Sequence, residues 1–361
     1  MSGIGERVEQ AIEHRADVEH EIERGEAATP ARGRLRRTAF WLGLTCVSLY
    51  LVFPSLVDVF GSWDDLDKLA PGWLAAMAGL QGLTVACLWA LQHVALRGSS
   101  WPAVVSSQLA GNALAKIAPG GGAVGAALQY RMLVQAGLRA DRAVAGLTAT
   151  NLLTLAVVLA LPVLAVPAIL RGGVSRELLE AAVVGVAVLI ALFAVGAVLV
   201  AFDGPLAWVG RVVQRVRNRL RRNAEPLRKL PQRLLEERAK MIGILGPHWK
   251  RALAATCGRW AFDYATLLAA LAAIGSEARP GLVLLAFCAA QLLAQIPLTP
   301  GGLGFVEAGL TATLTLAGVG AGAAVLATFA YRLFSYWLPL PLGLVAFGWH
   351  ARRYPRPAVT S

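Results

Sequence analysis

Long apolar runs alternate with short polar segments along most of this chain. Runs of span length cover about residues 38–60, 73–96, 143–170, 178–201, 252–274 and 321–349. A helix needs about 20 apolar residues to cross the hydrocarbon core of a bilayer, so each run predicts one full transmembrane helix. The pattern therefore predicts an all-α polytopic membrane protein with about six full transmembrane helices.

Two further apolar regions are interrupted by proline and glycine. In the first, which covers residues 101–137, two apolar runs that are each short for a full span flank the turn at residues 119–121. In the second, which covers residues 280–318, positions 297–304 read P-L-T-P-G-G-L-G. Because proline lacks an amide donor and glycine leaves the backbone unrestrained, a helix breaks at both places. We predict two Pro-Gly-broken re-entrant helical hairpins, although pairs of short full spans satisfy the same pattern.

Composition supports a membrane location. Hydrophobic residues make up 57% of the 361 residues, charged residues make up 16%, and the mean hydropathy is +0.58, which excludes an ordinary soluble domain. The basic residues behind the net charge of +12 concentrate between the apolar runs. Because basic loops stay on the cytoplasmic side, both termini are predicted to lie on the cytoplasmic side of the cell membrane. Nucleic acid is not an expected partner.

The charge pattern also sets the predicted domain organisation. One membrane domain covers residues 38–350, between a polar cytoplasmic tail at 1–37 and a shorter cytoplasmic tail at 351–361. A basic cytoplasmic loop, residues 203–250, interrupts the membrane domain.

Part of this basic loop has the pattern of an amphipathic helix. Trp208, Val212, Val216 and Leu220 recur every four residues opposite the arginines. That arrangement is typical of a helix that lies on an anionic membrane leaflet, so segment 205–240 is predicted to contact anionic lipid. A solvated basic loop that only sets the topology is an equally good interpretation.

The two interrupted regions are related to each other. When position 119 is placed on position 300, Pro119-Gly120-Gly121 aligns with Pro300-Gly301-Gly302, and ten of the 26 positions from 119 to 144 are identical without any gap. Charge placement opens the first hairpin to the cytoplasm and the second to the outside. The result is an inverted-topology repeat, which is typical of alternating-access transporters with a site near the midplane of the membrane.

The same turns carry the candidate chemistry. Each Pro-Gly-Gly begins a half-helix, whose free amides and positive dipole end attract an anion such as phosphate. Lys116, Arg131 and Arg332 are expected to add cationic contacts. Glu307 costs about 2.5 kcal/mol or more if it faces lipid, so it is expected to face a cavity and to bind a proton, a cation or an amine-bearing headgroup.

Other polar residues are predicted to be structural. Arg259 and Asp263 lie four residues apart on one helical face, where they are expected to neutralise each other as a pair. The four cysteines have no metal-ligand spacing, so no metal, disulfide or cofactor is expected. The chain also lacks a phosphate-binding G-x-x-x-x-G-K-[ST] loop and a nucleophile with an adjacent base, so we do not expect an enzyme.

At these motifs the chain resembles the lysylphosphatidylglycerol synthase transmembrane family, the flippase-like membrane half of lipid synthase/flippases. The likeness covers about residues 38–350 and implies movement of lipids across the cytoplasmic membrane. No acyltransferase-like synthase domain precedes Ser361, so synthesis of an aminoacyl lipid is not expected. The residues predicted to bind substrate are Asn112, Lys116, Pro119, Gly120, Gly121, Arg131, Pro300, Gly301, Gly302, Gly304, Glu307, Tyr331 and Arg332.

These observations favour a translocase for an anionic or polyprenyl-phosphate-type lipid. A secondary transporter of a small anion or ion would use the same half-helix site. A third interpretation is a membrane partner protein without transport activity, whose basic loop recruits an enzyme or anionic lipid.

Overall fold

The computed structural model describes residues 71–118, 121–165, 201–220, 229–295 and 300–355, together with positions 187, 191 and 194–199. All of them belong to the larger of the two compact units into which the chain divides, residues 52–361. This described part is all-helical, as predicted. The predictions for positions 1–70, and most of those for the span 178–201, lie outside the described residues.

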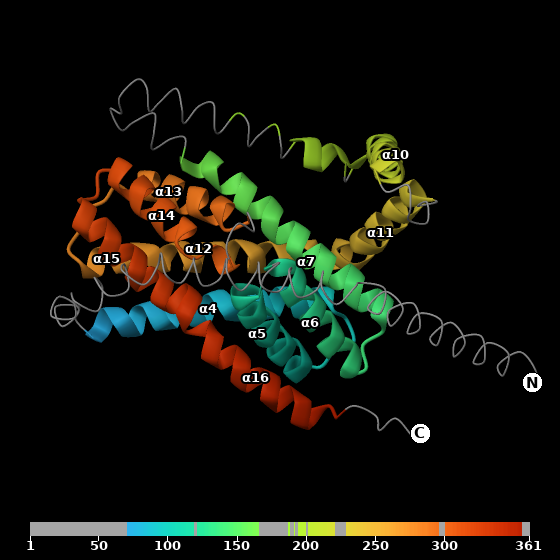
Figure 1. The fold of residues 1–361 in the computed structure, drawn as a ribbon, viewed down its shortest axis with the longest axis horizontal. Coiled ribbons are helices and arrows are strands. Elements are labelled where there is room, and N and C mark those ends of the chain that lie inside the picture. The colour runs from blue at the N-terminus through green and yellow to red at the C-terminus, as the bar shows by residue number, and fades with distance from the viewer. Residues whose placement is uncertain are drawn as a thin grey trace, which may run out of the picture. The chain divides into compact units, whose positions relative to one another are not determined.

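Three of the long apolar runs form long helices (Figure 1). They are α4 (Pro71–Ala95), α7 (Ala140–Ala160) and α12 (Trp249–Ala273). A short 3-10 helix, η1 (Leu161–Ala165), continues α7. In this part of the chain, α4 and the stretch 140–163 are long and apolar enough to cross a membrane. Helix α12 has 25 residues and is about 37 Å long.

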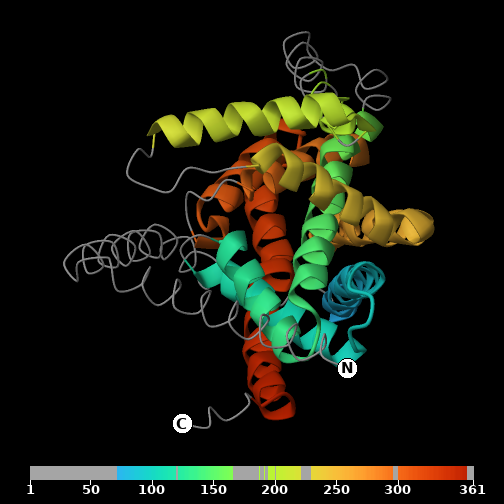
Figure 2. The same cartoon turned by 90° about the vertical axis from the view of Figure 1, so that its right-hand side faces the viewer.

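The last apolar run is not one regular helix. It forms α15 (Ala321–Arg332), a π-helical segment η4 (Leu333–Trp337) and α16 (Pro339–Arg353). Figure 2 shows these three pieces following one another along one line. Proline at position 339 cannot donate to the carbonyl four residues before it. The amide of the preceding residue, Leu338, bonds the Leu333 oxygen five residues back at 2.9 Å. The predicted single span 321–349 therefore contains a change of helical pitch.

Each interrupted region forms a pair of short helices. The first pair is α5 (Trp101–Ile117) and α6 (Gly122–Gln135), and the second is α13 (Pro280–Leu293) and α14 (Phe305–Leu316). At 17, 14, 14 and 12 residues, these helices are about 26, 21, 21 and 18 Å long, less than the hydrocarbon thickness of about 30 Å. A short 3-10 turn, η3 (Pro300–Gly302), precedes α14.

The sequence repeat is also a repeat of backbone structure. Helices α6 and α14 end, and α7 and α15 begin, at positions that are equivalent when 119 is placed on 300. Gly137 and Gly318 have φ angles of 93° and 92° after the two helix ends. The amide of the following residue, Leu138 or Val319, bonds a carbonyl five residues back at 3.0 Å or 3.1 Å, so both helices end in the same glycine motif.

Helix packing joins the two halves of the sequence. Helix α4 packs along α12, and α5 packs along α16, as Figure 1 also shows. A β-carbon on Gly343 of α16 would lie 2.5 Å from the carbonyl oxygen of Leu109 on α5, so the absence of a side chain allows this close crossing. Within the first hairpin, Gly111 and Gly125 approach each other in the same way.

The segment predicted as a basic loop contains two packed helices. They are α10 (Asp203–Leu220) and α11 (Leu230–Leu245), followed by a short 3-10 turn, η2 (Gly246–His248). Gly210 of α10 faces Pro231 of α11, while Trp208 and Val216 remain exposed with fractions of 59% and 51%. An amphipathic helix was expected around positions 208–220, whereas α11 was not.

Candidate functional site

The tips of the two hairpins meet at Gly301. This residue has a φ of 60°, and a β-carbon added to it would lie 2.6 Å from both the backbone oxygen of Lys116 and the ring of Tyr336. The Tyr336 hydroxyl donates to the same Lys116 oxygen at 2.9 Å. Glycine is required here because the backbone adopts a left-handed conformation and approaches two neighbours closely. The end of α5 in the first hairpin and the turn η3 of the second therefore pack against the π-helical segment η4.

Lys116 extends from the end of α5 to this π-helical segment. Its ammonium donates to the backbone oxygen of Ser335 at 2.6 Å and to that of Tyr336 at 3.4 Å. The Ser335 oxygen is free because Pro339, four residues later, has no amide hydrogen. The ammonium also lies 5.3 Å from the centre of the Tyr336 ring. Its contacts are therefore carbonyl groups and a ring face, all of them neutral.

Arg332 lies against the same aromatic ring. Its guanidinium is 4.4 Å from the centre of the Tyr336 ring, and its Nη2 donates to the Gly301 oxygen at 3.4 Å. Its Nε forms an ion pair with Oε1 of Glu307 at 2.6 Å. Lys116 and Arg332, which come from different repeats, thus both contact one tyrosine.

Glu307 lies in the first turn of α14 and is 8% exposed. A carboxylate there is stabilised by the helix dipole and by Arg332. Its second oxygen, Oε2, is buried and has no hydrogen-bond partner among the residues that the structure describes. The position in a half-helix was predicted, but the sequence did not indicate Arg332 as its partner.

A second polar cluster surrounds Asp263 on α12. The carboxylate accepts hydrogen bonds from Gln81 at 2.7 Å, from Tyr331 at 3.1 Å and from Gln291 at 3.3 Å. These donors come from α4, α15 and α13. Tyr331, which was predicted to bind substrate, donates its hydroxyl hydrogen to Asp263 in this structure.

Arg259 makes no direct ion-pair contact with Asp263, although the two charges are near enough to interact electrostatically. Its guanidinium lies 4.1 Å from the centre of the Trp260 ring, and its Nη1 is buried without a hydrogen-bond partner in the described part of the chain. Three neutral donors from neighbouring helices take the positions around the carboxylate. The i to i+4 spacing allowed a pair, but packing supplied closer partners for Asp263.

The remaining predicted site residues divide into three groups. Asn112 lies half-buried on α5, one turn before Lys116. Arg131 is exposed on α6 and lies about 14 Å along the helix axis from the start of α6, away from the hairpin tip. Pro119 and Gly120 lie outside the described residues. The turn positions near the hairpin tips are Gly121 before α6, Pro300 and Gly302 in η3, and Gly304 before α14.

Sequence reasoning missed Tyr336, Gln81 and Gln291. The helix break beside Tyr336 did have a signal. A proline at 339 inside a long apolar run leaves the carbonyl of Ser335, the residue before Tyr336, without its helical donor. The two glutamines carried no local signal, since an amide in an apolar helix is also found as an isolated core residue.

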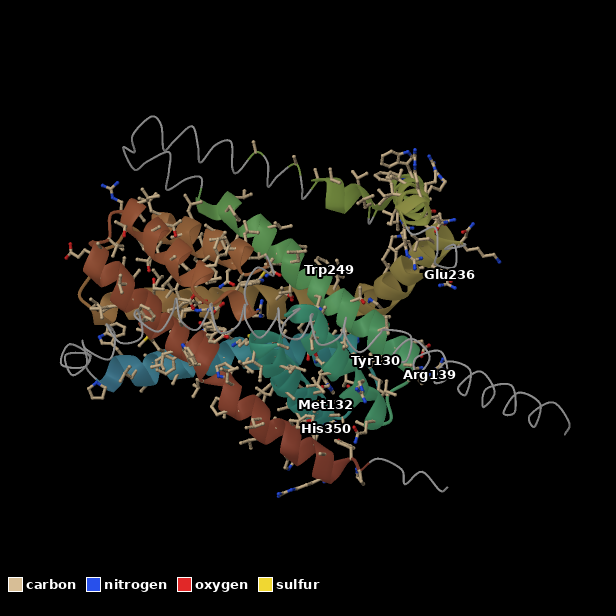
Figure 3. The ribbon with its side chains drawn as sticks, in the orientation of Figure 1. Tyr130, Met132, Arg139, Glu236, Trp249 and His350 are labelled. Carbon is tan, nitrogen blue, oxygen red and sulfur yellow. The ribbon has the colours of Figure 1, made fainter. Side chains whose placement is uncertain are left out.

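A buried histidine joins the first hairpin to α16. His350 Nδ1 lies 2.7 Å from the Ser106 hydroxyl, and its Nε2 lies 3.1 Å from the backbone oxygen of Met132. Figure 3 labels Met132 and His350. His350 is 1% exposed and Ser106 is 2% exposed. A serine beside a histidine resembles a nucleophile with its base, but here both side chains are buried where α5 and α16 pack together.

The chain matches a known family of membrane proteins. A search of curated proteins finds no match to the chain. The family model described as the lysylphosphatidylglycerol synthase TM region matches residues 40–343, which include both hairpins and the Glu307–Arg332 pair. This match and the apolar helices indicate a membrane protein with a lipid-related role. The chain belongs to the lysylphosphatidylglycerol synthase transmembrane family.

Proposed function

We propose that this protein moves a lipid with an anionic or polyprenyl-phosphate-type headgroup between the leaflets of the cell membrane. One observation carries the proposal. Lys116 and Arg332, cations from the two repeats, lie against the same tyrosine at the point where the hairpin tips meet. Cations in the interior of a membrane domain are costly and mark substrate or ion pathways.

The charges in contact at this point favour an anion. Arg332 is paired with the carboxylate of Glu307, whereas the contacts of Lys116 among the described residues are neutral. A protonated Lys116 would therefore carry a positive charge without an acidic partner in contact, which the single negative charge of a phosphodiester would neutralise. Burying that phosphate between Lys116 and Arg332 would replace the water that each charge otherwise requires.

Backbone amides add to the proposed headgroup site. Helices α6 and α14 begin after Gly121 and Gly304, and neither has a side-chain cap on its first amides. Such helix N-termini bind phosphate oxygens through free amides and the positive dipole end. Together with Lys116 and Arg332, they would surround a phosphate from several directions.

The architecture that we propose consists of six full transmembrane helices and two re-entrant hairpins within a domain at residues 38–350. The support is that the four hairpin helices are shorter than the hydrocarbon core, while their ends repeat in register. Both termini and the basic segment 203–250 would then be cytoplasmic, with tails at 1–37 and 351–361.

The inverted orientation predicts that equivalent positions of the two repeats lie on opposite sides of the membrane. Ala140 and Ala321 are exposed, equivalent in the repeat, and begin α7 and α15. In a variant without native cysteines, Ala140→Cys is expected to react with an impermeant maleimide only from the cytoplasmic side and Ala321→Cys only from outside. Labelling of both positions from the same face would overturn the inverted repeat, and Ala140→Cys labelled after permeabilisation serves as the reactivity control.

We propose transport without covalent chemistry. The buried Ser106–His350 contact is inaccessible to substrate, and no group of three potential metal ligands lies among the described residues. The labelled lipid recovered after an assay is therefore expected to be chemically unchanged. A released headgroup or altered chain would indicate an enzyme instead.

Helix α10 supplies an additional partner surface in the form of its exposed apolar face. Trp208 and Val216 are exposed on the same helix as Arg211, Arg215 and Arg219. Apolar and cationic side chains side by side complement an anionic leaflet, and this supports the proposed lipid contact of segment 205–240.

The central experiment measures leaflet exchange in proteoliposomes. Glu307→Gln is expected to slow the exchange of labelled anionic lipid at least about tenfold, which corresponds to ~1.4 kcal/mol in the barrier. The physical reason is that movement of the second hairpin against α15 separates Glu307 from Arg332, and the released carboxylate then exchanges a proton or cation. A glutamine cannot do so.

The outcome is read against empty liposomes and a matched variant. Glu277→Gln removes the same charge from an exposed loop and is expected to keep the parent rate. Exchange no faster than in empty liposomes, for phospholipids and polyprenyl phosphates alike, would contradict the translocase. Uptake of free phosphate without lipid exchange would favour the secondary transporter, which the same two cations would serve.

A further inference from the structure

The partner of Arg332 in this structure is an acid of the protein itself. Glu307 contacts Arg332 through one oxygen only, Oε1 at 2.6 Å, while Oε2 is buried without a partner among the described residues. A buried acceptor without a partner costs free energy, so the pair is weaker than a contact that satisfies both oxygens. An acceptor that offers more than one oxygen would therefore compete with Glu307 for this guanidinium.

A phosphate is such an acceptor. It offers several oxygens, and a guanidinium binds two of them side by side. Lys116 lies against the same Tyr336 ring, and its acceptors among the described residues are neutral, so it adds a second charge to a phosphate that reaches Arg332. A phosphate that binds Arg332 on its Nε side displaces Glu307, because Oε1 of Glu307 already accepts the Nε hydrogen there.

We infer that Glu307 is an intramolecular competitor of the lipid phosphate for Arg332. In the absence of headgroup it neutralises Arg332, and it is displaced when the phosphate binds. After displacement the carboxylate has lost its cation and returns to it, which promotes release of the headgroup. This inference rests on the proposed function, and it adds that the carboxylate weakens binding while speeding release.

The competition predicts an unusual pair of effects for one substitution. Glu307→Gln removes the negative charge that competes for Arg332, so an anionic phosphate lipid is expected to bind about tenfold tighter than to the parent. A residue that binds the headgroup directly would show weaker binding when it is replaced. Glu307→Asp keeps the charge but shortens the side chain by one methylene, so its affinity is expected to lie between those of the parent and Glu307→Gln.

The test uses the full chain in detergent micelles and measures equilibrium binding of a fluorescent short-chain phosphatidylglycerol. Diacylglycerol with the same label lacks the phosphate and is expected to bind all variants equally. Glu277→Gln, in an exposed loop, is expected to match the parent. Because ligand binding stabilises the folded state, the phosphate lipid is also expected to raise the thermal midpoint of Glu307→Gln more than that of the parent.

Each outcome decides the inference. Unchanged or weaker binding by Glu307→Gln overturns it, as does equal tightening toward diacylglycerol. If Glu307→Gln does not fold, binding by Glu307→Asp at or below the parent affinity overturns it instead. Leaflet exchange is measured separately on the parent. If Glu307→Gln binds the phosphate lipid more tightly but the parent shows no leaflet exchange, the proposed translocase is contradicted. The competition between Glu307 and the phosphate for Arg332 is then still supported.

Discussion

Replacement of Arg332 by glutamine is expected to destabilise the protein by about 3–5 kcal/mol. The substitution leaves Glu307, which is 8% exposed and already has one unpartnered oxygen, as a buried carboxylate without a cation. It also removes the guanidinium from the Tyr336 ring and from the Gly301 oxygen. The free energy of unfolding in mixed micelles measures the effect.

A double-mutant cycle identifies the cause. Arg332→Gln combined with Glu307→Gln removes both charges, so it is expected to be less destabilising than the sum of the single substitutions. Additive effects would show that the two side chains do not depend on each other. Such a result would contradict the ion pair on which the further inference rests.

Gly301→Ala is expected to cost about 1–2 kcal/mol from its left-handed backbone and a further ~1–3 kcal/mol from overpacking. The added methyl would meet the Lys116 oxygen and the Tyr336 ring at 2.6 Å, where backbone on one side and a buried ring on the other limit relaxation. Lipid exchange is expected to fall with it, because the tips of the two hairpins would be forced apart. Gly301→Val is expected to be more severe, since a β-branched side chain fits this conformation less well.

Gly318→Ala is the matched control for this substitution. Its φ of 92° imposes at least as much backbone strain on alanine as the 60° of Gly301, but nothing lies within 4 Å of an added β-carbon. The difference between the two variants therefore measures the contact between hairpin tips. Equal losses of stability and of lipid exchange at both positions would contradict the close packing at Gly301.

Local features of the sequence determined the helices and their breaks. Apolar runs, prolines and glycines act through neighbouring residues, so the short hairpin helices and the break before α14 could be predicted. The repeat was visible for the same reason. Pro-Gly-Gly and Ala-Gly specify a turn and a helix end, and equal local sequences produced equal backbone conformations at Gly137 and Gly318.

Partnerships between distant residues were decided by the tertiary structure. Glu307 and Arg332 are 25 residues apart, and Gln81 and Asp263 are 182 residues apart. No spacing rule connects such positions, because the packing of helices chooses among many polar groups of similar chemistry. The i to i+4 rule suggested Arg259 for Asp263, yet donors on three other helices were closer.

The π-helical segment η4 shows most clearly which features were local and which depended on the tertiary structure. The sequence by itself determined that Pro339 leaves the Ser335 carbonyl without its helical donor. Only the tertiary structure decided which group takes that place, because the end of α5 brings the ammonium of Lys116 to within 2.6 Å of the oxygen. A local break creates an unsatisfied group, whereas the partner that satisfies it depends on which segments fold together.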